Sequence, residues 1–64
     1  MNPFDELLKI SQTEKKGLTF YLDGQTIPGI VISVNAGTET VEVKNQTHSR
    51  ILIRLDRVNA VAMS

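Results

Sequence analysis

The feature that most restricts the fold of this chain is a strand-like segment, residues 25–34, with a proline and a glycine near its centre. It follows an Asp-Gly pair and ends before a second group of turn residues, Asn35–Thr38. Pro28 lacks the N–H that a β-ladder requires and Gly29 lacks a side chain, so the strand is expected to bend or bulge there. A bent strand can contribute to both halves of a small barrel, and the segment therefore favours a strongly curved sheet.

A tight hairpin is predicted immediately before this segment. From Leu18 to Leu22 the apolar residues alternate with polar ones at a period of two, which predicts a strand over about residues 18–22. Asp23-Gly24 is the strongest short hairpin signal in the chain. We expect a type I′ turn, in which both central residues have positive φ.

Short alternating segments follow to the end of the chain, and a helix precedes the strands. Strands are predicted at about residues 18–22, 25–34, 40–45, 50–55 and 58–63. The helix is predicted over about residues 3–12, with Asn2 as its N-cap and Pro3 in its first turn. Its apolar face consists of Phe4, Leu7, Leu8 and Ser11. The expected fold is mostly β: an N-terminal α-helix followed by a five-stranded, strongly bent open barrel.

We predict one domain, residues 1–64, that would be only marginally stable as a single copy. A chain of this length buries only about 60% of its unfolded surface, and its sequence contains no cysteine that could form a disulfide. The predicted last strand, Val58–Ala62, carries neither charge nor proline to protect an exposed edge. We therefore expect another subunit to cover this edge, in a head-to-tail contact that can close into a ring.

Charge is divided along the chain although the net charge is zero. Residues 1–43 contain three lysines and six acidic residues, whereas residues 44–64 contain four cations and one acidic residue. In a ring this division would repeat as an acidic zone and a basic zone. The basic zone is a candidate phosphate-binding surface, and ordinary solvated surface charge is the alternative.

Two motifs resemble those of a known family. The first is a pair of glycines followed by apolar residues and a polar one: Gly24, Gly29, Val31, Val34 and Asn35. The second is Ile53-Arg54-Leu55-Asp56-Arg57-Val58. Together with Pro3-Phe4, Tyr21-Leu22 and Lys44-Asn45 they make the chain similar to the Sm/Lsm family, which includes the bacterial host-factor branch, Hfq.

The resemblance implies a function as well as a fold. It implies an Sm-like, SH3-like barrel whose fourth strand pairs with the fifth strand of a neighbour, in a hexameric or heptameric ring that holds single-stranded RNA. The candidate RNA-binding residues are Arg54, Asn35, Tyr21, Thr40, Lys44, His48 and Arg57. Base stacking and arginine contacts are the expected mode of binding.

Each principal candidate also has a structural alternative. Arg54 could instead be an exposed strand arginine or form an ion pair between subunits with Asp56 or Glu42. Asn35 could serve the backbone of its turn, and Tyr21 could serve cross-strand packing. His48, the only histidine, could be a solvated loop residue.

The chain departs from the family pattern in three ways, of which the Leu55-Asp56 departure, together with the zero net charge, favours a second function. Leu55 replaces a glycine of the second motif, and Leu55-Asp56 stands where the bacterial branch has a Lys-His pair. The turn after Val34 is also one or two residues longer than usual, so Thr38, Glu39 and Thr40 all remain candidates for the base-stacking position. With apolar Ile30 and Ile32 where polar residues are common, the alternative is an Sm-like ring that acts as a protein-interaction scaffold without RNA.

The sequence gives no indication of an enzyme, a cofactor or a metal. One histidine without cysteine or clustered carboxylates does not make a metal site or an acid–base pair, and Ser33 and Ser49 have no predicted base. No apolar run is long enough to span a membrane, and no signal-peptide pattern is present. We expect a cytoplasmic protein with RNA, copies of itself and other proteins as its candidate partners.

Overall fold

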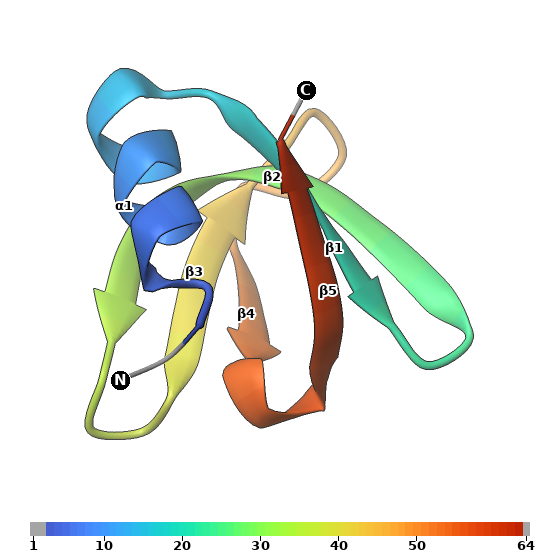
Figure 1. Cartoon of the computed structure of the whole chain (residues 1–64). Coiled ribbons are helices and arrows are strands. Elements are labelled where there is room, and N and C mark those ends of the chain that lie inside the picture. Colours follow the sequence, from blue (N-terminus) through green and yellow to red (C-terminus); the bar gives the residue numbers. More distant parts are fainter. Residues whose placement is uncertain (1–2, 64) are drawn as a thin grey trace.

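In the computed structural model, which describes residues 3–63, a helix precedes a five-stranded antiparallel sheet (Figure 1). The elements are α1 (Asp5–Glu14), β1 (Gly17–Leu22), β2 (Gln25–Asn35), β3 (Thr40–Lys44), β4 (Ile51–Arg54), the 3-10 turn η1 (Leu55–Arg57) and β5 (Val58–Met63). The strand order is β4-β3-β2-β1-β5, so β4 and β5 are the two edges and the sheet is not closed. The expectation of a mostly β fold with an N-terminal helix is confirmed.

Helix α1 lies two residues further along the chain than predicted. It begins at Asp5, with Phe4 as an N-cap that makes no side-chain capping bond, and it ends at Glu14. The predicted cap, Asn2, lies outside the described residues. The C-cap is Lys15, whose positive φ of 56° ends the helix in a left-handed residue.

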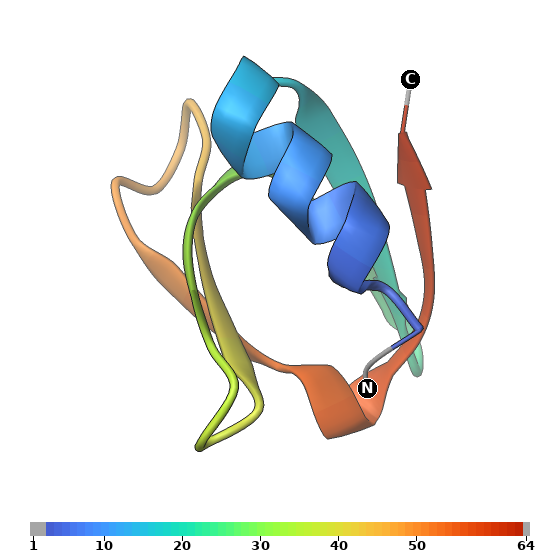
Figure 2. The ribbon, with the colours of Figure 1, turned by 60° about the vertical axis from the view of Figure 1, so that its left-hand side comes forward.

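The apolar face of α1 packs as the sequence indicated. Leu8 and Ser11 are buried, and Phe4 and Leu7 pack against the core. Figure 2 shows the sheet curled around this core, with α1 lying across one end of it. The other members of the core come from all five strands and η1: Leu18, Phe20, Val31, Val41, Val43, Ile53, Leu55 and Val58.

The β1–β2 hairpin is present, but the predicted turn type is wrong. Leu22 pairs with Gln25 across the two-residue Asp23-Gly24 loop. Only Gly24 has positive φ, at 78°, whereas a type I′ turn requires it at both positions. The left-handed conformation is thus adopted by Gly24, which has no Cβ to make it unfavourable. The Asp23 carboxylate instead accepts a hydrogen bond from Asn59 Nδ2 of β5 at 2.8 Å.

Strand β2 belongs to both halves of the sheet. Its first half pairs with β1 up to Ile30, and its second half pairs with β3 from Ile30 to Asn35. The ladder with β3 shifts register between Val31 and Ser33, so the irregularity is centred on Ile32 and not on the Pro28-Gly29 pair. Gly29 serves a different purpose there, because a Cβ at this position would lie 3.0 Å from both the Lys44 carbonyl oxygen and Val43 Cγ2.

Helix α1 supplies hydrogen bonds to β2 where its ladder is irregular. The Ser11 hydroxyl accepts a bond from the Val31 N–H at 3.1 Å and donates to the Lys16 carbonyl. Gln12 Nε2 donates to the Ile32 carbonyl at 3.0 Å. An unpaired backbone group is costly when it is buried, so the Ser11 hydroxyl stabilises the irregular segment of β2 at the buried Val31 N–H. The exposed bond from Gln12 is a second link between α1 and β2.

The close approach of β3 to Gly29 predicts a specific destabilisation. Gly29→Ala should lower the free energy of unfolding by about 1–3 kcal/mol, because the new methyl group meets backbone that cannot move without breaking the ladder. The measurement is urea denaturation followed by circular dichroism.

Gly17→Ala is the matched control, since a Cβ at that position meets nothing within 4 Å. It should leave stability unchanged or raise it by about 0.4–1 kcal/mol. Equal stability of the two alanine variants would contradict the close approach at Gly29.

Candidate nucleic-acid interface

Two turns that are distant in sequence are joined at one end of the sheet. The Leu55 N–H in η1 donates to the Glu39 carbonyl, in the turn between β2 and β3, at 2.8 Å. Both turns lie at the lower end of Figure 1. Glu39 has a φ of 52°, an uncommon conformation for a residue other than glycine, and the Leu55 side chain is only 5% exposed. Leu55 therefore contributes its side chain to the core and its backbone N–H to the bond that joins the turns.

Three of the predicted RNA-binding residues form a row beside these turns. Asn35 pairs with Thr40 across β2 and β3, and Thr40 pairs with Arg54 across β3 and β4. Directly paired residues share a face of the sheet. The neighbouring pair Val41–Ile53 is buried, so Asn35, Thr40 and Arg54 lie on the outer face. We call these three residues the polar row.

Asn35 has half of its hydrogen-bonding capacity occupied by its own turn. Its Oδ1 accepts bonds from the N–H groups of Gly37, at 3.0 Å, and Thr38, at 3.2 Å. Its Nδ2 donates to no acceptor among residues 3–63. The structural role considered for this residue is thus present, and only its two amide donors remain for a ligand.

Thr40 begins β3 and takes part in the same network. Its hydroxyl lies 2.8 Å from that of Thr38, and either oxygen can be the donor. The turn between the strands comprises residues 36–39. Of the three residues considered for base stacking, Thr40 alone has a ladder position, while Thr38 and Glu39 belong to the turn.

Arg54 is exposed and is paired with the acid that follows it by two residues. Its Nη2 donates to Asp56 Oδ2 at 3.1 Å, and the two side chains are 66% and 49% exposed. Glu42, the other acid considered as its partner, pairs instead with Arg50, whose Nε lies 3.1 Å from Glu42 Oε2. Arg54 is therefore an exposed strand arginine, and its ion pair with Asp56 forms within one chain, whereas the pair considered as an alternative is one between subunits.

The basic segment is thus partly neutralised by its own acids. Arg50 and Arg54 have carboxylate partners, whereas Lys44 and Arg57 form no ion pair with any residue that the structure describes. Lys44 ends β3 on the same outer face as the polar row, opposite Ile30. Arg57 is exposed in η1. The unpaired positive charges therefore lie at Lys44 and Arg57.

Tyr21 lies apart from the polar row. It is 42% exposed on β1, where it pairs with Thr26 of β2 and Ala60 of β5. These strands form the half of the sheet that does not include β3 and β4. A ligand on the polar row would reach this ring only by crossing to the other half of the sheet.

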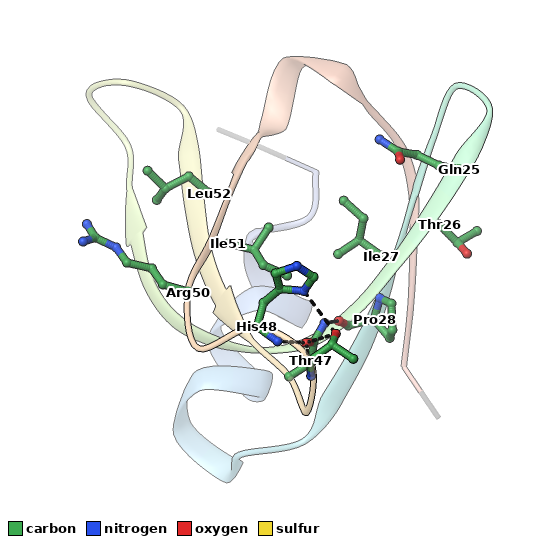
Figure 3. A pocket seen from close by; sticks show the side chains of 10 residues that line it. Gln25, Thr26, Ile27, Pro28, Thr47, His48, Arg50, Ile51 and Leu52 are labelled. Atoms are coloured by element: carbon green, nitrogen blue, oxygen red, sulfur yellow. Dashed lines mark hydrogen bonds between the residues drawn. The ribbon is translucent and has the colours of Figure 1, made fainter.

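His48, in the loop between β3 and β4, lines a cavity away from the polar row (Figure 3). The cavity, of about 590 Å³, has Ile27 and Ile51 among its apolar lining residues and Arg50 among its polar ones. The His48 Nδ1 atom lies 3.1 Å from the Thr47 hydroxyl. His48 therefore belongs to a second region of the surface, which the polar row does not include.

Asn45 organises that loop, a role that the sequence analysis missed. Its Oδ1 accepts bonds from the Thr47 N–H, the Thr47 hydroxyl and the His48 N–H, and its Nδ2 donates to the Pro28 carbonyl at 2.7 Å. The signal that could have identified it is an asparagine two residues before a threonine in a polar segment, which is typical of an Asx turn.

No protein-family model matches this chain, and no curated protein or solved structure is significantly similar to it. Residues 3–63 contain no group of three or more His, Cys, Asp or Glu side chains that could hold a metal ion. Within the same range, no helix is long and apolar enough to span a membrane.

The occupied acceptor of Asn35 predicts different effects for two substitutions. Asn35→Ala should lower the free energy of unfolding by about 1 kcal/mol, because the N–H groups of Gly37 and Thr38 lose their partner. Asn35→Asp retains an oxygen at the same position and should stay within about 0.5 kcal/mol of the wild type. Chemical denaturation measures both, and equal losses would contradict the role of Oδ1.

Proposed function

We propose that this chain is a ring-forming, Sm-like protein that binds single-stranded RNA. The observation that carries the proposal is the polar row on the outer face of the sheet, in which the ladders pair Asn35 with Thr40 and Thr40 with Arg54. The row lies beside the two turns that the Leu55–Glu39 hydrogen bond joins. The motifs that resemble the Sm/Lsm family are the segments that lead into these two turns. Because the polar row lies where these two turns meet, both motifs can contribute residues to one binding surface.

The two edge strands support assembly into a ring. β4 and β5 each have a free side, and β5 carries no charged residue between Val58 and Met63. Pairing of β4 with β5 of a neighbour would remove both edges, and a constant rotation between subunits would close the ring. Subunit contacts would also extend a core to which few residues of this short chain contribute.

The chemistry of the polar row suits an unpaired base. A guanidinium offers a flat face for stacking together with several donors, and Asn35 adds two amide donors. Lys44 and Arg57, which have no acidic partner among residues 3–63, are suited to phosphates. Repetition around a ring would multiply a weak contact into useful affinity.

One observation favours the alternative, a protein-interaction scaffold. Leu52 is 63% exposed on the outer face of β4, between Arg50 and Arg54. Ile32, at the irregularity of β2, is also exposed. Apolar side chains repeated around a ring would form a protein-docking surface. Absence of RNA binding by an intact ring, even at low salt, would favour this function.

The ring can be tested with two prolines in β5. Successive residues of an antiparallel edge strand direct their N–H groups alternately toward the sheet and away from it. Of Ala60→Pro and Val61→Pro, one should therefore destabilise the β1–β5 ladder, while the other should leave the subunit folded and remove a bond to the neighbour.

Circular dichroism identifies the folded variant, and light scattering gives its mass. We expect the wild type to be a hexamer or heptamer and the folded proline variant to be smaller. A monomeric wild type at micromolar concentration, or a folded variant with unchanged mass, would contradict edge pairing through β5.

RNA binding can be tested at Arg54. Arg54→Ala should weaken binding of oligo-A or oligo-U by about 1–3 kcal/mol for each contacted base, the order expected for loss of a stacking or multidentate contact. Fluorescence anisotropy gives the affinity and light scattering the oligomer size, which should not change because the side chain is exposed.

Lys16→Ala is the matched control. It also removes one exposed cation, but it does so between α1 and β1, away from the two joined turns. Equal losses for both variants would indicate diffuse charge attraction and no specific contact at Arg54.

A further inference from the structure

We propose that Asp56 determines what Arg54 recognises, by making it a group that reads bases and does not hold phosphates. This inference rests on the proposed RNA-binding function and assigns a role to the one acidic residue among residues 44–64. Asp56 would thereby give the polar row its selectivity for single strands over other polyanions.

The geometry of the pair carries this inference. The contact joins one terminal nitrogen of Arg54 to one carboxylate oxygen of Asp56, at 3.1 Å. No other hydrogen bond involves either side chain within the described part of the protein. The remaining donors of the guanidinium, its flat face and the second carboxylate oxygen are consequently free, and both side chains are well exposed.

The free atoms form a mixed set of donors and an acceptor. A phosphate offers only acceptors and carries negative charge, so the Asp56 carboxylate repels it and offers it no bond. The Watson–Crick edge of a base presents acceptors and donors side by side, which can bond to Arg54 and Asp56 respectively. In a duplex those edges are already paired, and only a single strand exposes them.

Other side chains supply the phosphate contacts. Arg57 follows Asp56 directly in η1 and forms no ion pair with residues 3–63, and the same is true of Lys44 at the end of β3. Within the site, the neutralised Arg54 contacts bases, and the unpaired Lys44 and Arg57 contact the phosphate backbone. Each unpaired cation adds to the salt dependence of binding, whereas a neutralised one adds little.

Asp56→Asn is the decisive variant. Asparagine keeps the size of the side chain and an oxygen that can accept from Arg54, so it removes the charge while preserving the contact. Asp23→Asn is the control, because it makes the same charge change in the β1–β2 turn, where the acid bonds to Asn59 instead. Arg57→Ala is a second control that removes a phosphate contact.

The experiment compares three classes of polyanion, namely single strands, duplex and polyphosphate, over a range of salt concentrations. Affinity is measured for oligo-A and oligo-U, for an RNA duplex, and for inorganic polyphosphate with as many phosphates as the oligonucleotides. Asp56→Asn should bind polyphosphate and duplex more tightly, so that the preference for single strands falls severalfold. The slope of log affinity against log salt for single strands should steepen by about 0.7 per phosphate gained, and Arg57→Ala should make it shallower by a similar amount.

The outcomes separate this inference from the function on which it rests. If wild type binds single strands but Asp56→Asn and Asp23→Asn change all three affinities equally, the role of Asp56 is refuted and RNA binding stands. If Asp56→Asn weakens binding of every polyanion, Asp56 merely supports the structure and the inference also fails. If neither wild type nor Asp56→Asn binds single strands, both the inference and the proposed function are wrong.

Discussion

The structure depends on the course of β2, the one strand that takes part in both halves of the sheet. Its first half pairs with β1 and its second half with β3. Gly29 lets β3 approach closely, and the Ser11 hydroxyl bonds to the Val31 N–H beside the register shift. These contacts hold the curved sheet around the core and fix α1 across one end of it (Figure 2). The junction of the two turns, made by the Leu55 N–H and the Glu39 carbonyl, depends on this curvature.

Two of the arginines near the candidate site form ion pairs with acidic side chains, and this pairing limits what the site can bind. Two of the four cations in the C-terminal segment have carboxylates within hydrogen-bonding distance. Exposed pairs of this kind contribute little to stability, but they cancel charge that would otherwise attract any polyanion. The surface therefore differs from a uniformly basic zone. It combines two unpaired cations with a row whose free groups are mainly donors, and such a surface is better suited to selective contacts than to diffuse ones.

Part of the candidate site could be predicted from the sequence, because register follows from alternation. The period of two places Arg54 opposite the apolar residues of its strand, and the structure finds it exposed. Other properties could not be predicted. Whether Asn35 serves its turn or a ligand depends on the direction of one carbonyl oxygen. The separation of Tyr21 and His48 from the polar row depends on which strands are neighbours in the sheet.

The sequence by itself determined the class of fold, the number of strands and the positions of the turns, because periodicity and turn residues such as Gly24 act locally. Only the tertiary structure decided where β2 is irregular, since α1 provides the hydrogen bonds that stabilise that segment. Only the tertiary structure decided, likewise, that the β2–β3 turn and η1 are joined. The Leu55 N–H meets the Glu39 carbonyl across 16 positions of sequence, because a contact between distant residues exists only once the sheet has curled and the Leu55 side chain has entered the core.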